Sequence, residues 1–121
     1  MSQPKRVILT GVRGNVARAF TAYMKREHPE VEIVPLLPFP FRPSAIVELL
    51  KSGTIGYFVN CASLGSDSES CKVPASYFET NVSGVATQLE MIRLHSPQTR
   101  YLNLGTIFEE ADSQTPYVAS K

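Results

Sequence analysis

A chain of 121 residues, 43% hydrophobic and 19% charged, is long enough for one globular domain with a single core. Its net charge of +1 gives no electrostatic reason to expect nucleic acid or an anionic membrane as a partner. Its longest apolar stretch, residues 31–41, is too short for a bilayer, and its start lacks a signal-peptide pattern, so we expect a cytoplasmic protein.

The cysteines and histidines predict neither a disulfide framework nor a metal site. Cys61 closes an apolar run, which predicts a reduced, buried residue at a strand end, and Cys71 falls in a polar loop. His28 and His95 lie far from both cysteines in the sequence, without metal-ligand spacing.

The first half of the chain predicts two strand–helix units. Residues 7–10 and 31–37 are apolar and rich in β-branched side chains, which is typical of buried strands. Residues 15–27 and 44–52 predict helices, the first ended by a proline and the second by a glycine. The expected apolar face of the first helix consists of Val16, Ala19, Phe20, Tyr23 and Met24.

The second half continues the alternation. Residues 55–62 and 100–105 predict a third and a fourth strand, and residues 73–95 predict a long helix between them. The expected apolar face of that helix consists of Phe78, Val82, Val85, Leu89 and Ile92. Strands alternating with helices predict an α/β fold with a Rossmann-like, doubly wound parallel sheet, truncated after the fourth clear strand.

A glycine-spaced turn joins the first predicted strand to the first predicted helix. The first N–H groups of a helix have no partner within it, which suits such a turn to a pyrophosphate. Gly11 permits the tight turn, Gly14 lets a phosphate approach the backbone, and the small Ala17 lets the helix pack on the sheet. The alternative is an ordinary strand–turn–helix connection in which the glycines serve geometry alone.

The end of the second predicted strand bears on the choice of dinucleotide. NAD-binding domains use an Asp or Glu there for the ribose 2′-hydroxyl, whereas residues 35–37 of this chain are Pro-Leu-Leu. Arg13 and Arg42 are suited to a 2′-phosphate, which favours NADP unless both side chains are merely solvated.

Several motifs, in order along nearly the whole chain, resemble the extended short-chain dehydrogenase/reductase family. The resemblance is greatest to nucleotide-sugar epimerases, dehydratases and dTDP-4-dehydrorhamnose-reductase-like members. Residues 10–17 look like the family's T-G-x-x-G-x-x-G/A turn, residues 59–63 like its V-N-C-A-A strand end, and residues 67–84 like its reductase-type helix. Residues 102–106 look like the strand that delivers a catalytic Ser or Thr, and residues 117–121 carry the Y-x-x-x-K signature. No single motif is specific. The ordered set of motifs on the expected strands and helices is much stronger evidence for the family.

The resemblance implies an NAD(P)-dependent oxidoreductase or epimerase that acts on a nucleotide-sugar-like substrate. The implied catalytic residues are Tyr117, Lys121 and Thr106. The expected cofactor-binding residues, which include the two arginines named above, are Gly11, Arg13, Gly14, Asn15, Val16, Arg42, Cys61, Ala62, Ser63, Asn81 and Lys121.

The chemistry of hydride transfer explains the residue types of the signature pair. A tyrosine with a pKa of about 10 is a poor base at neutral pH. A lysine one helical turn away lies on the same face, and its charge favours the phenolate, which suits Tyr117 to general acid–base work. Lys121 is also suited to hold the nicotinamide ribose, and Thr106 to hydrogen-bond the substrate oxygen. The alternative is a helix-surface pair without chemistry.

Four departures from the family pattern refine the expectation. Gly105 replaces a customary serine, and Ile107-Phe108 stands where 4,6-dehydratases have Asp-Glu, which disfavours that reaction. The segment 106–117 is short for a sugar-nucleotide enzyme. Family members continue well past the lysine, so residues 1–121 predict an NAD(P)-binding domain without its substrate-binding region, which we expect to be inactive alone.

For the isolated chain we expect either disorder after about Thr106 or an assembly, such as a homo-oligomer, that hides an exposed apolar face. Two other functional readings stay open: a non-enzymatic nucleotide-binding or sensor protein, and an interaction module in which both motifs are relics.

Overall fold

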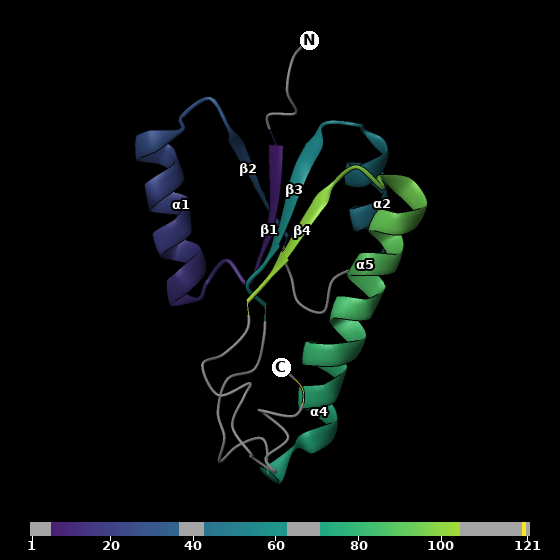
Figure 1. Cartoon of the computed structure of the whole chain (residues 1–121). Coiled ribbons are helices and arrows are strands. Elements are labelled where there is room, and N and C mark those ends of the chain that lie inside the picture. The colour runs from purple at the N-terminus through teal and green to yellow at the C-terminus, as the bar shows by residue number, and fades with distance from the viewer. Residues whose placement is uncertain (1–5, 37–42, 63–70, 105–119, 121) are drawn as a thin grey trace.

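Strands and helices alternate along the chain in a computed structural model, which describes residues 6–36, 43–62, 71–104 and 120 (Figure 1). The strands are β1 (Arg6–Thr10), β2 (Glu32–Pro35), β3 (Ile55–Asn60) and β4 (Arg100–Asn103). The longer helices are α1 (Asn15–Glu27), α2 (Pro43–Lys51) and α5 (Gly84–His95). A short helix α4 (Pro74–Phe78) and a π-helical turn η1 (Glu79–Ser83) run directly into α5. These bounds agree with the predicted elements to within one or two residues.

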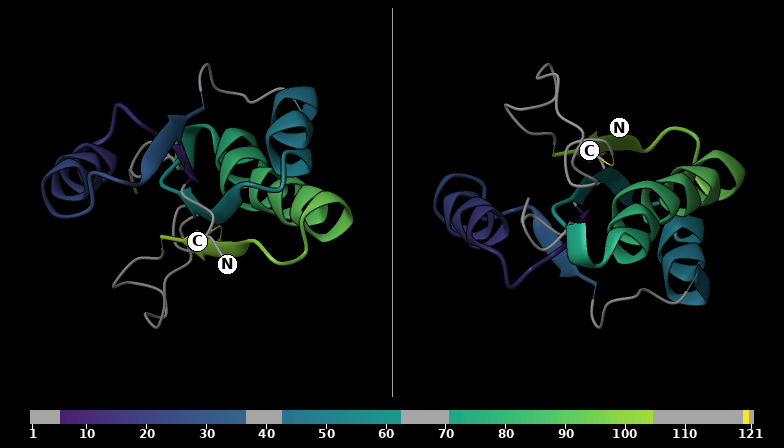
Figure 2. Two further views of the ribbon diagram at one scale, coloured as in Figure 1. Left: turned by 90° about the horizontal axis from the view of Figure 1, so that it is seen from above. Right: turned by 90° about the horizontal axis from the view of Figure 1, so that it is seen from below.

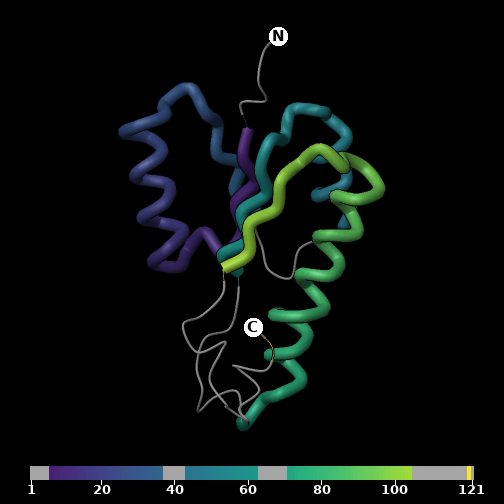
Figure 3. Tube along the Cα trace, in the orientation of Figure 1, coloured from purple at the N-terminus to yellow at the C-terminus, as the bar shows by residue number. Residues whose placement is uncertain are grey.

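The four strands form one parallel sheet in the order β2-β1-β3-β4. Figure 2 shows α1 on one face of this sheet and α2 with α5 on the other. Chain reversal through helices on both faces is what a parallel sheet requires, so the predicted Rossmann-like, doubly wound fold is confirmed. The carboxyl ends of all four strands lie at one edge, the same edge at which α1 begins (Figure 3).

Alternate strand residues feed two hydrophobic clusters, one on each face of the sheet. On the α1 face the cluster consists of Val7, Leu9, Ala17 and Val59. On the other face Ile8 and Phe58 pack with the buried helix residues Ile46, Leu50 and Ile92. The α1 face is incompletely covered over β3 and β4, because Tyr57 is 44% and Leu102 is 51% exposed.

The predicted inward face of α1 was wrong in part. Ala17 is the fully buried residue of the helix, and Phe20 and Met24 are half-buried, whereas Val16, Ala19 and Tyr23 are exposed. The smallest side chain in the first turn faces the sheet because it lets the helix start approach β1 closely. A reading based on hydrophobicity alone gives too much weight to the larger residues.

The predicted apolar face of the long helix was also wrong. Phe78, Val82 and Leu89 are 41–45% exposed, and only Ile92 of the predicted face is buried. The inward side carries Tyr77, Thr80, Asn81 and Gln88 instead. One cause is η1, where the Gly84 N–H donates to the carbonyl of Glu79, five residues back. Each π-turn holds an extra residue and so rotates the following side chains away from an α-helical register.

The sulfur and membrane predictions have mixed outcomes. Both cysteines are reduced thiols, but Cys61 lies just beyond β3 and is half-buried rather than buried, and Cys71 is exposed and helical rather than in a loop. Within the described residues, no cluster of His, Cys, Asp and Glu is suited to a metal ion. No helix in that part of the chain is long and apolar enough to cross a membrane.

Candidate functional site

The glycine turn leaves the start of α1 open to solvent. Gly11 has a φ of +67°, the left-handed conformation that favours glycine, and its carbonyl accepts the Gly14 N–H at 3.0 Å. Gly14 is the N-cap of α1, with no side-chain hydrogen bond to the first turn and no acidic residue within it. Gly14, Asn15 and Val16 are all exposed. The helix therefore presents unpaired N–H groups and the positive end of its dipole, which is the arrangement that binds phosphate groups.

The turn packs directly on the segment that follows β3. A Cβ atom on Gly11 would lie 2.5 Å from the carbonyl carbon of Cys61 and 2.6 Å from the nitrogen of Ala62. The Ala62 N–H donates to Thr10 Oγ1 at 3.2 Å, and the Cys61 N–H donates to the Thr10 carbonyl at 3.3 Å. The structure thus brings together the predicted cofactor residues Gly11, Cys61 and Ala62 at the carboxyl edge of the sheet.

A row of polar side chains crosses this edge beneath the turn. Thr10, Asn60 and Asn103 end β1, β3 and β4 and stand in register with one another. The Thr10 hydroxyl donates to Asn60 Oδ1, and Asn60 Nδ2 donates to Asn103 Oδ1 at 2.8 Å. None of these three residues was predicted as a site residue from the sequence. The signal was present, since each is polar and closes an otherwise apolar or mixed strand.

Asn81 joins the π-turn to the end of the chain. Its side chain is 6% exposed, and Nδ2 donates to Ser120 Oγ at 3.0 Å. Ser120 is itself 3% exposed, and it lies between the predicted catalytic residues Tyr117 and Lys121 in the sequence. The contact therefore holds Ser120, the described residue of this segment, beside η1, and π-turns are frequent at functional sites.

A polar pair in the interior supports α5 against β4. The Tyr101 hydroxyl donates to Gln88 Oε1 at 2.6 Å, and the Tyr101 ring packs on Phe58 with centroids 5.4 Å apart. Burial raises the pKa of Tyr101 well above its ordinary value. Tyr101 is therefore neutral at physiological pH and acts as a hydrogen-bond donor within the fold.

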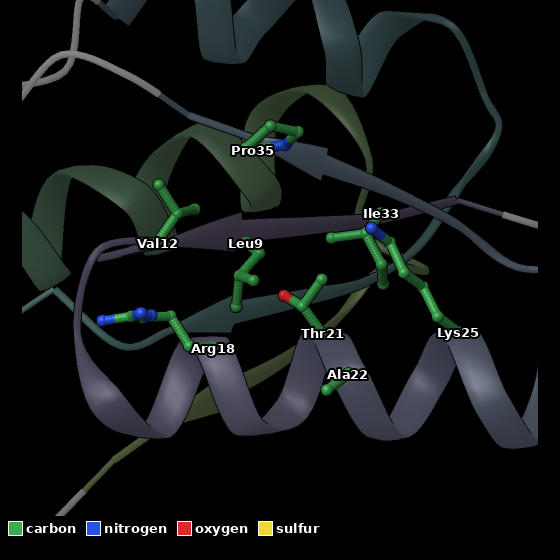
Figure 4. A pocket seen from close by; sticks show the side chains of 8 residues that line it. All are labelled: Leu9, Val12, Arg18, Thr21, Ala22, Lys25, Ile33 and Pro35. Atoms are coloured by element: carbon green, nitrogen blue, oxygen red, sulfur yellow. The ribbon is translucent and has the colours of Figure 1, made fainter.

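A groove of about 490 Å³ lies between α1 and β2, and Val12 is the residue of the glycine turn that borders it (Figure 4). Arg18, Thr21, Ala22 and Lys25 line it along α1, and Leu9, Val12, Ile33 and Pro35 line it from the sheet side. None of the predicted cofactor residues lines it. The groove is thus not the candidate dinucleotide site.

Comparison with known proteins places the chain in a family. The family model described as NAD dependent epimerase/dehydratase matches residues 7–121. The chain belongs to the NAD-dependent epimerase/dehydratase family. The comparison with curated proteins gives no match.

Solved structures of this kind share the fold of the chain. A UDP-glucose-4-epimerase from Stenotrophomonas maltophila with bound NAD and formylated UDP-arabinopyranose is similar at a TM-score of 0.81 and 17% identity, over 97% of this chain and 45% of that one. A dTDP-4-dehydrorhamnose reductase from Bacillus anthracis in complex with NADP is similar at a TM-score of 0.77 and 18% identity, over 100% and 48%. A Clostridium acetobutylicum dTDP-4-dehydrorhamnose reductase is similar at 0.78 and 16%, over 96% and 46%. The chain spans about half the length of these proteins.

The residues that the family resemblance implies fall into two groups. Described at the carboxyl edge are Gly11, Arg13, Gly14, Asn15, Val16, Cys61 and Ala62, and Asn81 lies in η1. Outside the described residues are Arg42, Ser63, Thr106, Tyr117 and Lys121, together with the predicted disorder or assembly after Thr106. The catalytic set therefore stays a prediction from the sequence motif, and of residues 117–121 the structure describes Ser120.

Proposed function

We propose that residues 1–121 form the NAD(P)-binding Rossmann domain of an oxidoreductase or epimerase of the extended short-chain type. The observation that carries the proposal is the packing of Gly11 on Cys61 and Ala62 beside the uncapped start of α1. Among the described residues, a Cβ atom at Gly14 would meet only the Gly11 carbonyl, at 3.3 Å, so this part of the structure leaves the space in front of the turn open. This cradle of backbone N–H groups fits a pyrophosphate.

The cofactor would be held chiefly by main-chain groups. The N–H groups of Asn15 and Val16 would face the pyrophosphate, with the exposed Arg13 guanidinium as a further positive charge. Cys61, Ala62 and Ser63 would form the floor beneath the dinucleotide. Once bound, NAD(P) supplies a carbon that accepts or donates hydride.

The remaining roles concern the proton and the substrate. Tyr117 would pass a proton to or from the reacting substrate oxygen, and Lys121 would favour its phenolate and hold the nicotinamide ribose. Thr106 would hydrogen-bond the same oxygen. Asn81 would keep this segment in place through Ser120, whose hydroxyl it contacts at 3.0 Å.

The finer proposals are the substrate, the cofactor preference and the assembly. A nucleotide sugar is the substrate class we propose, because the similar epimerase holds a UDP-sugar. NADP is the preferred cofactor because Pro35-Leu36-Leu37 has no carboxylate for a ribose 2′-hydroxyl. The exposed seam of Phe78, Val82 and Leu89 would suit a second copy of the chain. We further propose that the protein is cytoplasmic.

The test is calorimetric titration of the chain with NADPH and with NADH. We expect binding of both, with NADPH the tighter, and no binding to Gly14→Val, whose side chain would fill the cradle. Gly14→Val has to retain its circular dichroism spectrum and thermal midpoint, because only then does lost binding report on the site. If Gly14→Val bound NADPH as tightly as the unaltered chain, the dinucleotide would have to bind elsewhere. Binding without turnover in the protein that carries this chain would favour a sensor over an enzyme.

A further inference from the structure

The polar row beneath the turn has a defined direction. The Ala62 N–H is a main-chain group that can only donate, and it donates to Thr10 Oγ1. The single proton of the Thr10 hydroxyl is therefore directed to Asn60 Oδ1. The Asn60 amide then turns its Nδ2 to Asn103 Oδ1. These four groups thus form one donor-to-acceptor row, in which each hydrogen bond polarises the next.

The two ends of the row differ in burial. Thr10 is fully buried and Asn60 is 2% exposed, whereas Asn103 is an exposed residue. Loss of the Asn103 acceptor would leave an N–H of the Asn60 amide without that partner in a buried position, which is unfavourable. Substitution of Asn103 itself removes no apolar core contact. Its effect should therefore travel through Asn60 and Thr10.

The row acts on the segment against which the glycine turn rests. Thr10 holds the Ala62 N–H, and Gly11, the next residue in the chain, has no room for a Cβ against Cys61 and Ala62. A shift of Thr10 or Ala62 by a few tenths of an ångström would change the shape of the cradle. The residue after β4 is also bonded to the end of β3, because the Leu104 N–H donates to the Asn60 carbonyl at 3.3 Å.

We propose that Asn103 is a positioning residue that, through Asn60 and Thr10, holds the Ala62 segment and the glycine turn in the shape that binds the dinucleotide. This inference rests on the proposed function. It also links the floor under the cofactor to the end of β4, three residues before Thr106. Asn103 acts through the row, by the hydrogen bond that its Oδ1 accepts from Asn60 Nδ2.

Two variants of Asn103 separate this role from simple packing. Asn103→Leu removes the acceptor at nearly constant size, and Asn103→Asp retains an oxygen that accepts from Asn60 Nδ2. Leu102→Thr is the matched control, since Leu102 is the adjacent β4 residue, points to the opposite face and is 51% exposed. NADPH affinity and Ala62 amide hydrogen exchange are measured for each.

We expect Asn103→Leu to weaken NADPH binding about fivefold to tenfold, the range for losing one hydrogen bond. We expect Asn103→Asp and Leu102→Thr to stay within about twofold of the unaltered chain. Thr10→Val should weaken binding similarly, and the Thr10→Val/Asn103→Leu double variant should be no weaker than the poorer single variant, because the row acts as one unit.

Hydrogen exchange gives a readout that needs no cofactor. In Asn103→Leu the Ala62 amide should exchange at least about fivefold faster, while the Leu36 amide, which donates to the Leu9 carbonyl, should not change. Unchanged exchange of Ala62 would overturn the inference, and so would unchanged affinity of Asn103→Leu in a chain that binds NADPH. Failure of the unaltered chain to bind NADPH would instead refute the proposed function, and the exchange of Ala62 would still decide whether the row holds that segment.

Discussion

The close approach of Gly11 to the end of β3 predicts a specific loss of stability in Gly11→Ala. Alanine at the observed φ of +67° costs about 1–2 kcal/mol of backbone strain. Its Cβ would also lie 2.5–2.6 Å from three main-chain atoms of Cys61 and Ala62. Main-chain atoms cannot move aside as the end of a flexible side chain could. Such overpacking typically costs about 1–3 kcal/mol. We therefore expect Gly11→Ala to lower the free energy of unfolding by about 2–5 kcal/mol.

Gly53→Ala is the matched control for this prediction. Gly53 has a similar φ of +74°, but a Cβ there would meet no atom within 4 Å. It should lose only the strain of about 1–2 kcal/mol. Urea unfolding followed by circular dichroism gives both values, provided that the transitions are two-state. Equal losses in the two variants would show that Gly11 is not pressed against the Cys61–Ala62 segment, and the geometry inferred for the cradle would be wrong.

Three other predictions concern the cofactor, the proton and a buried phenol. Arg42→Ala should weaken NADPH binding more than NADH binding in calorimetry, and an equal change would remove Arg42 from the 2′-phosphate site. In the enzyme that carries this chain, Tyr117→Phe should lose nearly all turnover at unchanged cofactor affinity, and substantial residual turnover would assign the proton to another group. Because burial raises the folded-state pKa of Tyr101, its contribution to stability is present below pH ~10 and falls as the pH rises above that. Tyr101→Phe should flatten this alkaline loss in urea unfolding between pH 9 and 11, although it also leaves Gln88 Oε1 without its donor.

The fold could be predicted from the sequence because its signals are local. Short, mostly apolar runs predicted the four strands, and Pro29 and Gly53 marked helix ends. The parallel sheet then follows from the alternation of strands and helices. The signal for the glycine turn was also local, since Gly11, Gly14 and Ala17 lie close together in the sequence, between the end of β1 and the first turn of α1.

The details that failed depend on tertiary contacts. The burial of Ala17 rather than Val16 reflects the closeness of α1 to the sheet, which hydrophobicity does not encode. The π-turn at η1 rotates the long helix so that Asn81 and Gln88 face inward, where each has a polar partner. The row from Thr10 to Asn103 joins residues from three strands that are far apart in the sequence. The spacing of these residues in the sequence therefore does not predict their contact.

The measurement that tests the central claim most directly is a titration of the ¹⁵N-labelled chain with NADPH, followed by amide chemical shifts. The account predicts that the largest shifts occur at residues 11–16 and at Ala62, where the cradle lies. Thr21 and Ile33, which line the separate groove between α1 and β2, should change little. Largest shifts at Thr21 and Ile33, or no shifts at millimolar NADPH, would contradict the assignment of the glycine turn as the dinucleotide site.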